Sequence, residues 1–337
     1  MSGRLKLRRG VVVDEDPLTV EVDGERRLAW ADEALLGEMR EGDEVIINVA
    51  AKDLGLGSGG FDVIHVNLTR GLEADPAGAE HVMKLNYTSL QHPVAPVELP
   101  KEERKSSISV LVLPLHGHLA PAAWAATQAS PELKVGYVQT AGGALPGSLS
   151  RDVAQLRERG LLCGHITAAP AYGGEHEALS VAGALDAAAD SLGWDVALVG
   201  PGPGIIGSDT RLGHGGMVAL DNAHAALALG LPTLLSPRLS EADPRARHRG
   251  VSHHTLTVLE LLLGGVGVPV PEGSSDVAAQ LADAAGDRHE LHEAKPDLAG
   301  YEASGLSTHT MGRGIADDQL FFAAALVAGT YLGSSRT

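Results

Sequence analysis

Residues 195–216 read DVALVGPGPGIIGSDTRLGHGG, and they indicate the fold class of most of the chain. The first five, Asp195 to Val199, form an apolar run of strand length without alternation, as in a strand buried on both faces of a sheet. A turn rich in glycine and proline follows at once. A strand of this kind that ends in such a loop is typical of a parallel sheet flanked by helices.

The same strand-and-loop pattern recurs on both sides of this stretch, from Ser106 onward. Short apolar segments alternate with longer segments of helical pattern, which predicts an α/β fold with a mainly parallel sheet and helices on both of its faces. Ser150 and Ser252 are expected helix N-caps, and Gly160 and Gly193 are expected helix ends. The predicted strands are 108–113, 134–139, 161–167, 195–199 and 232–236, and the predicted helices are 150–160, 175–192, 256–263 and 320–333.

The first hundred residues follow a different pattern. Short β-rich pieces, separated by turn signals such as Asp23-Gly24, predict a small barrel-like domain over residues 1–100. A stretch rich in proline and charge, 91–105, is typical of a linker, so we expect a linker at 101–106 and an α/β domain over 107–337. The expected barrel strands are 5–13, 18–22, 26–30, 44–49 and 62–68, with 81–87 as a continuation.

Composition and charge restrict the function classes. The 337 residues carry a formal net charge of -17, and a field of that sign repels nucleic acid and anionic membranes, so neither is expected as a partner. The longest apolar run, 320–333, is too short to span a bilayer. The one cysteine, Cys163, cannot form an intramolecular disulfide, and no signal segment opens the chain, which predicts a cytoplasmic location. Inside a predicted strand, Cys163 is expected to be buried and unreactive.

Loops that follow parallel strands meet at one edge of a sheet, where helix N-termini also point. The loop after residue 199 contains Gly202-x-Gly204-x-x-Gly207, which formally matches a dinucleotide fingerprint. However, Pro203 removes an amide that could face a phosphate, and the next strand lacks the ribose-binding acid, so the sequence identifies no cofactor. The candidate ligand-binding residues of this edge are Gly142, Gly143, Gly202, Gly204, Gly207, Ser208, Asp209 and Arg211.

A second candidate region is 243–255, which reads DPRARHRGVSHHT. It places three arginines and three histidines in a strongly acidic chain, next to a helix N-terminus, and this favours a phosphate or carboxylate ligand. The alternative is that these arginines pair with acids such as Asp243 or lie at a subunit interface. The candidate anion-binding residues are Arg245, Arg247 and Arg249, and the candidate general acids or bases are His253 and His254.

Histidines on converging loops also allow a metal site, with His116, His118 and His214 as candidate ligands. Neither HExxH nor a pair of CxxC motifs is present, so the sequence specifies no metal, and a metal-dependent hydrolase stays an alternative function. A further alternative is a non-catalytic ligand sensor or an oligomeric scaffold, and a homo-oligomer is expected in that case.

Four segments carry a resemblance to a known family: 81–88, 200–216, 236–255 and 310–314. They resemble an uncharacterised bacterial family, domain of unknown function 3866, over nearly the whole chain. The resemblance implies a bacterial protein and supplies no reaction, cofactor or catalytic residue. We therefore expect a protein that binds a small anionic metabolite at the carboxyl edge of its sheet, with the substrate and the reaction left open.

Overall fold

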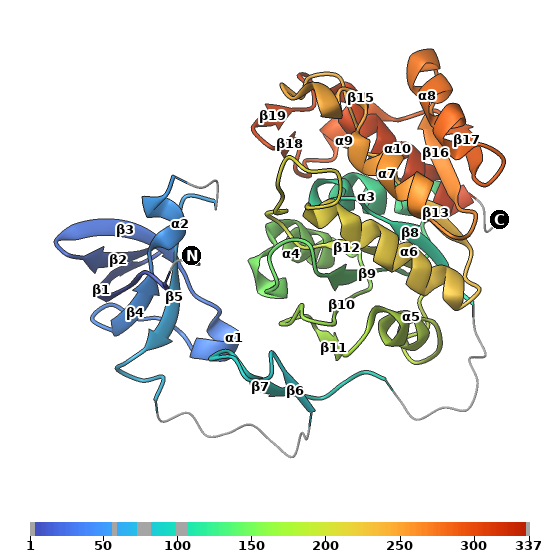
Figure 1. The fold of residues 1–337 in the computed structure, drawn as a ribbon. Helices are drawn as coiled ribbons and strands as arrows, with labels where there is room; N and C mark the ends of the chain where they lie inside the picture. Colours follow the sequence, from blue (N-terminus) through green and yellow to red (C-terminus); the bar gives the residue numbers. More distant parts are fainter. Residues whose placement is uncertain (1–3, 56–58, 73–81, 99–106, 335–337) are drawn as a thin grey trace. The chain divides into compact units, whose positions relative to one another are not determined.

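The computed structural model describes residues 4–55, 59–72, 82–98 and 107–334. The chain forms two compact units, Met1–Pro93 and Val94–Thr337 (Figure 1). The boundary precedes the one predicted at residue 100, because the backbone N–H of Val97 donates to the Glu177 carbonyl of the larger unit (2.7 Å). The predicted linker, 101–106, lies outside the described residues. Among the described residues, no helix combines the length and the apolar character needed to cross a bilayer.

The smaller unit contains a closed barrel of five strands in the order β1-β2-β3-β5-β4, which confirms the predicted barrel. Alternating apolar residues fill its interior, with Val12, Val20, Val45 and Ile47 fully buried. The barrel strands are β1 (Leu7–Glu15), β2 (Leu18–Val22), β3 (Glu25–Trp30), β4 (Glu44–Asn48) and β5 (Asp62–Asn67); the unit adds the short helices α1 (Glu33–Leu36) and α2 (Ala50–Asp53), while β6 (Val82–Lys84) pairs with β7 (His92–Val94).

The larger unit is built on an eight-stranded parallel sheet in the order β11-β10-β9-β12-β8-β13-β16-β17, as the sequence predicts for the fold class. The predicted strands agree with the observed ones to within three residues at each end, but β11, β16 and β17 were not predicted. The strands are β8 (Ser109–Val112), β9 (Val135–Thr140), β10 (Gly164–Ala168), β11 (His176–Ala178), β12 (Val196–Pro201), β13 (Thr233–Leu235), β16 (Gly267–Pro271) and β17 (Glu290–Ala294).

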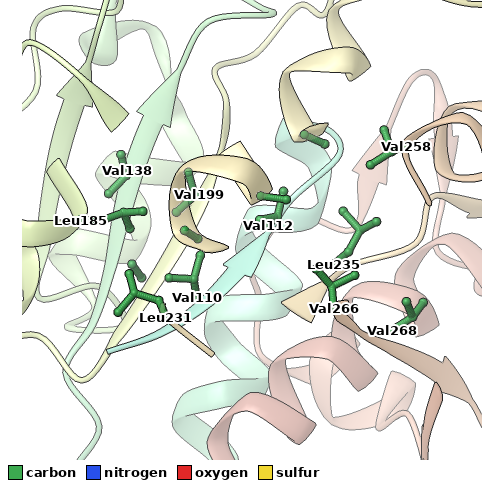
Figure 2. Close-up of a cluster of buried hydrophobic side chains, with 14 of the residues drawn as sticks. Val110, Val112, Val138, Leu185, Val199, Leu231, Leu235, Val258, Val266 and Val268 are labelled. Carbon is green, nitrogen blue, oxygen red and sulfur yellow. The ribbon is translucent and has the colours of Figure 1, made fainter. Parts of the chain in front are cut away.

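Helices cover both faces of this sheet (Figure 1). Side chains from α5 to α8 pack on one face with the apolar strand residues that Figure 2 shows, such as Val110 and Val199. Side chains from α3, α4, α9 and α10 pack on the opposite face. The helices are α3 (Leu119–Ala129), α4 (Arg151–Glu158), α5 (Val181–Asp190), α6 (Val218–Ala228), α7 (His253–Leu261), α8 (Ser275–Ala285), α9 (Leu298–Ala303) and α10 (Gln319–Ser334).

Two local predictions need correction. The helix predicted from residue 175 begins at Val181, because Ser180 caps it by accepting the Gly183 N–H (2.9 Å), and residues 176–178 form β11 instead. Cys163 is exposed and lies just before β10 instead of inside a strand. Partial burial raises the pKa of its thiol to about 11, so the reactive thiolate is scarce at neutral pH, as expected for an unreactive cysteine.

Helices α3 and α10 approach each other closely where glycines face alanines. A Cβ at Gly329 would collide with the Ala122 carbonyl oxygen, and a Cβ at Gly333 would lie 2.7 Å from the Ala126 carbonyl oxygen. We expect Gly329→Ala to lower the free energy of unfolding by about 1–3 kcal/mol, because the added methyl forces two packed helices apart. Urea denaturation measures this change. Thr330→Ala on the same helix is the control, and equal midpoints for the two variants would contradict the close approach.

Next to β8, the connections between strands change direction along the sheet. From β8 the chain passes through α3 on one face, whereas from the neighbouring β12 it passes through α6 on the opposite face. The loops that leave β8 and β12 therefore separate at the carboxyl edge of the sheet. In open α/β sheets, this is the place where ligands bind.

Candidate functional site

The loops after β12 and β13 carry most of the candidate residues. His214 ends the loop after β12, just before η3 (Gly215–Met217) and α6. The segment after β13 forms β14 (Leu239–Ser240), η4 (Ala246–His248) and β15 (Gly250–Val251) and leads into α7, and the hairpin of β18 (His309–Thr310) and β19 (Arg313–Gly314) adds one arginine. We call the group they form the histidine–arginine cluster: His214, His248, His253, His254, Arg238, Arg245, Arg247, Arg313 and Asp243.

Three guanidinium groups converge on one oxygen of Asp243. The nearest nitrogens of Arg245, Arg238 and Arg313 lie 2.8, 3.5 and 3.7 Å from Oδ2. The Asp243 side chain is fully buried; burial alone would raise its pKa, but hydrogen bonds from Arg245 hold the pKa far below its ordinary range. Arg313 also donates to Asp318 (3.0 Å). Among the described residues, the ion pairs of these three arginines reach two carboxylates, Asp243 and Asp318, so the arginines outnumber their direct acidic partners in a strongly acidic protein.

Two guanidinium nitrogens of the cluster, Arg247 Nε and Arg313 Nη2, are buried and have no acceptor within hydrogen-bond distance among the described residues. Arg313 Nη2 still lies in ion-pair range of Asp243 Oδ2, at 3.7 Å, whereas Arg247 Nε has no such contact in the described ranges. The Nη2 of Arg247 donates to the exposed Asp209 carboxylate (2.6 Å). Burial, with repulsion from Arg245, lowers the pKa of the Arg238 guanidinium to about 10. Both observations indicate a place that an additional negative charge would stabilise.

The four imidazoles of the cluster lie against one another. His214 stacks on His254 with ring centroids 3.5 Å apart and planes 4° from parallel, and His253 meets His254 edge-on at 4.4 Å. His248 lies 5.0 Å from His253. Burial lowers the pKa of all four; together with the charge of Arg238 it lowers the pKa of His248 to about 3 and that of His254 to about 2. The rings are therefore neutral at neutral pH.

Hydrogen bonds fix which ring nitrogen carries the proton in two of these imidazoles. Arg238 Nη1 can only donate, so His254 Nδ1 accepts (3.2 Å) and the proton of the neutral ring lies on Nε2. His214 Nε2 donates to the Arg211 carbonyl (2.9 Å), which leaves Nδ1 with a free lone pair. Within the described part of the chain, His214 Nδ1 and His253 Nε2 are buried and have no hydrogen-bond partner.

Only one of the three histidines predicted as metal ligands belongs to this cluster. Atoms of His214, His253 and His254 that could hold a metal all lie within 4.8 Å of one another. His116 instead contacts Ser150 Oγ through Nε2 (2.8 Å). His118 contacts Ser236 Oγ through Nδ1 (2.9 Å) and packs edge-on against a phenylalanine. His116 and His118, both in η1 (His116–His118), are thus engaged in the hydrogen bonding of the sheet edge.

The candidate glycines have a packing role that the sequence did not predict. The loops after β9 and β12 lie backbone against backbone, with the Ala144 N–H donating to the Pro203 carbonyl (2.6 Å). A Cβ at Gly143 would collide with the Gly202 carbonyl, and one at Gly142 would lie 2.6 Å from the Gly215 carbonyl. This contact requires glycine whether or not a ligand is bound.

The rest of the loop after β12 forms a small hairpin that presents His214. Gly207 pairs with His214 in an isolated bridge, and Gly204 has a φ of 72°, which favours glycine. Ser208 Oγ donates to the Gly213 carbonyl inside the hairpin (2.9 Å). Arg211 pairs with Glu260 of α7.

The arginines predicted to clamp an anion differ in their contacts. Two nitrogens of Arg245 donate to the Asp243 carboxylate, in line with the alternative of internal ion pairs. Arg249 Nε donates to the backbone carbonyl of Asp243 (3.0 Å). Nothing among the described residues accepts a hydrogen bond from Arg247 Nε. Sequence reasoning missed Arg238, His248 and Arg313 as site residues. The segment 310–314 had been noted for its family resemblance, but nothing in the sequence places Arg313 next to residues about seventy positions earlier.

The fold and the cluster define a class: a β-barrel unit joined to a doubly wound α/β unit with a partly buried group of arginines and histidines at the edge of its parallel sheet. The chain belongs to the family described as a protein of unknown function, DUF3866, which matches residues 28–329. This match runs from β3 into α10 and so includes parts of both units. Neither a curated protein nor a solved structure matches the chain.

Proposed function

We propose that the histidine–arginine cluster binds a small oxyanion, such as the phosphate or carboxylate group of a metabolite. The observation that carries this proposal is the buried Arg247 Nε, which has no acceptor among the described residues, together with Arg313 Nη2, which has none within hydrogen-bond distance and only the longer contact with Asp243 (3.7 Å). A buried donor without an acceptor costs about 1–3 kcal/mol, and more when the group is charged. An oxyanion supplies acceptors and offsets the positive charge of the guanidinium groups around Asp243.

The contacts distinguish the arginines that could bind the anion from those that hold Asp243 in position. Arg247 Nε, and Arg313 Nη2 at the longer distance from Asp243, have donors for the anion, whereas Arg245 and Arg249 hold Asp243 in place. The general acid or base predicted at His253 or His254 stays a prediction. The contacts speak against His254 as a proton acceptor, because Arg238 occupies its lone pair and its pKa lies at about 2.

The subunit-interface alternative rests on the same arginines. Arg245 and Arg249 both bind Asp243 within one chain, which accounts for their presence without a partner subunit. Light scattering separates the two functions. Anion binding predicts that Arg247→Gln leaves the mass in solution unchanged, whereas an interface at this segment predicts a lower mass.

Arg247→Gln is expected to weaken the stabilisation by phosphate. The wild-type protein is first freed of metal by chelation. Its melting temperature should then increase with the concentration of inorganic phosphate, relative to chloride of equal ionic strength. The variant loses a charge-assisted hydrogen bond worth about 1.5–3 kcal/mol, so the phosphate concentration for half of the effect should rise about tenfold or more. Thermal-shift titration measures both.

Arg9→Gln is the matched control, because Arg9 forms an exposed ion pair with Glu44 in the barrel unit. The control should respond to phosphate like the wild-type protein. An identical response of all three proteins, or no response in any of them, would overturn the proposed function.

A further inference from the structure

Two of the four buried imidazole nitrogens that have no hydrogen-bond partner among the described residues lie together in the cluster, and they call for an explanation of their own. Among the described residues nothing bonds to His214 Nδ1 or His253 Nε2, although both atoms are buried. The lone pair of His214 Nδ1 cannot bind an anion, because it needs a proton donor or a metal ion. Oxyanion binding at Arg247 and Arg313 therefore leaves this atom unexplained.

His214 also has the outer hydrogen bond that is typical of a metal ligand. Its Nε2 donates to the backbone carbonyl of Arg211 (2.9 Å), which fixes the tautomer and directs the free lone pair of Nδ1 toward the cluster. The candidate ligand atoms of His214, His253 and His254 lie within 4.8 Å of one another. The loop after β12 supplies the first imidazole, and the first turn of α7 supplies the other two.

We propose that His214, His253 and His254 bind one transition-metal ion of the zinc class. Three imidazoles without a carboxylate suit zinc, cobalt, nickel or copper, and they do not suit magnesium or calcium, which prefer oxygen ligands. A three-histidine set leaves one coordination position open for an exogenous ligand. The imidazoles then serve as metal ligands, in place of the proton transfer expected from the sequence.

Binding requires a local rearrangement. Nitrogens held at about 2.0–2.1 Å from a tetrahedral ion lie about 3.3 Å apart, so ligand atoms within 4.8 Å of one another must approach by up to about 1.5 Å. The parallel stack of His214 on His254 must also open, because the lone pairs lie in the ring planes. His254 must also release Arg238 Nη1. His214 and His253 are thus the two ligands available at once, and His254 is the third.

The surrounding arginines make the site dependent on anions. A divalent cation adds to a cluster whose arginines already outnumber the carboxylates that they contact. An oxyanion at Arg247 offsets this charge, so metal and oxyanion should each strengthen the binding of the other. The metal should therefore be tested in the presence of an oxyanion that forms soluble salts with it, such as sulfate.

Cobalt titration tests the inference. Co²⁺ added to the metal-free full chain in sulfate buffer should produce a visible d–d absorption band that saturates at one ion per chain. His214→Asn and His253→Asn should each raise the dissociation constant about tenfold or more, and His65→Asn in the barrel unit, the control, should not change it. Circular dichroism of each variant verifies that it is folded.

The two proposals can fail separately. No saturable band in the wild-type protein, or equal affinities of the wild-type protein and both folded cluster variants, would overturn the metal site. Phosphate stabilisation of the chelated protein that depends on Arg247 would still support oxyanion binding in that case. Cobalt binding that depends on His214 and His253 supports the metal site even where phosphate has no effect on the chelated protein.

Discussion

Asp243→Asn is expected to lower the free energy of unfolding by about 3–5 kcal/mol, because removal of one partner from a buried ion pair leaves uncompensated charge behind. Asp243 is fully buried and contacts the guanidinium groups of Arg238, Arg245 and Arg313. Asparagine keeps the shape and some hydrogen bonds but removes the negative charge. In the variant Arg238 and Arg245 lose this carboxylate, while Arg313 keeps its contact with Asp318.

Urea denaturation at neutral pH measures this loss. Asp209→Asn is the control: Asp209 also accepts from an arginine, at 2.6 Å, but its side chain is 88% exposed, and an exposed pair contributes less than about 1 kcal/mol. Equal losses for the two variants would show that the buried carboxylate does not hold the cluster together. Phosphate should stabilise Asp243→Asn more than the wild-type protein, because the variant has more positive charge to neutralise.

Acidification from pH 7.5 to pH 5 is expected to cost about 2 kcal/mol of stability for each of two buried histidines, His118 and His165. Burial lowers the pKa of each to about 3, whereas an unfolded histidine titrates near 6.5. Between these values the unfolded chain binds a proton that the folded chain does not. Their contribution is therefore complete above about pH 6.5 and falls as the pH decreases toward 3.

His165→Phe isolates one of these contributions. The ring of His165 stacks on Tyr137 at 5.3 Å, and phenylalanine keeps an aromatic ring there without a titrating group. The quantity to compare is the difference in the free energy of unfolding between pH 7.5 and pH 5. This difference should be about 2 kcal/mol smaller in the variant, and an unchanged difference would show that His165 is not the group responsible.

The fold class could be predicted because local patterns match the final environment. Buried parallel strands such as β12 have continuous apolar runs, and the barrel strands alternate. The missed strands break these rules. β16 contains Pro269 and Pro271, and β17 is a polar strand at the edge of the sheet with Glu290 exposed.

The site could be predicted only in part, since its contacts are tertiary. The segment 243–255 was identified from its composition. However, Asp243 also contacts Arg313, which lies in β19, just before α10, and only the tertiary fold brings these two residues together. The role of the candidate glycines could not be predicted, because close approach of a ligand and close approach of a neighbouring backbone both require a residue without a Cβ. Gly142 and Gly143 lie against a neighbouring backbone.

The central claim is that an oxyanion binds at Arg247 and Arg313, and a crystal structure with tungstate, a heavy analogue of phosphate, tests it most directly. The proposal predicts an anomalous peak within hydrogen-bond distance of Arg247 Nε and Arg313 Nη2, lost in crystals of Arg247→Gln. Tungstate bound only elsewhere, with both N–H groups donating to protein atoms, would contradict it.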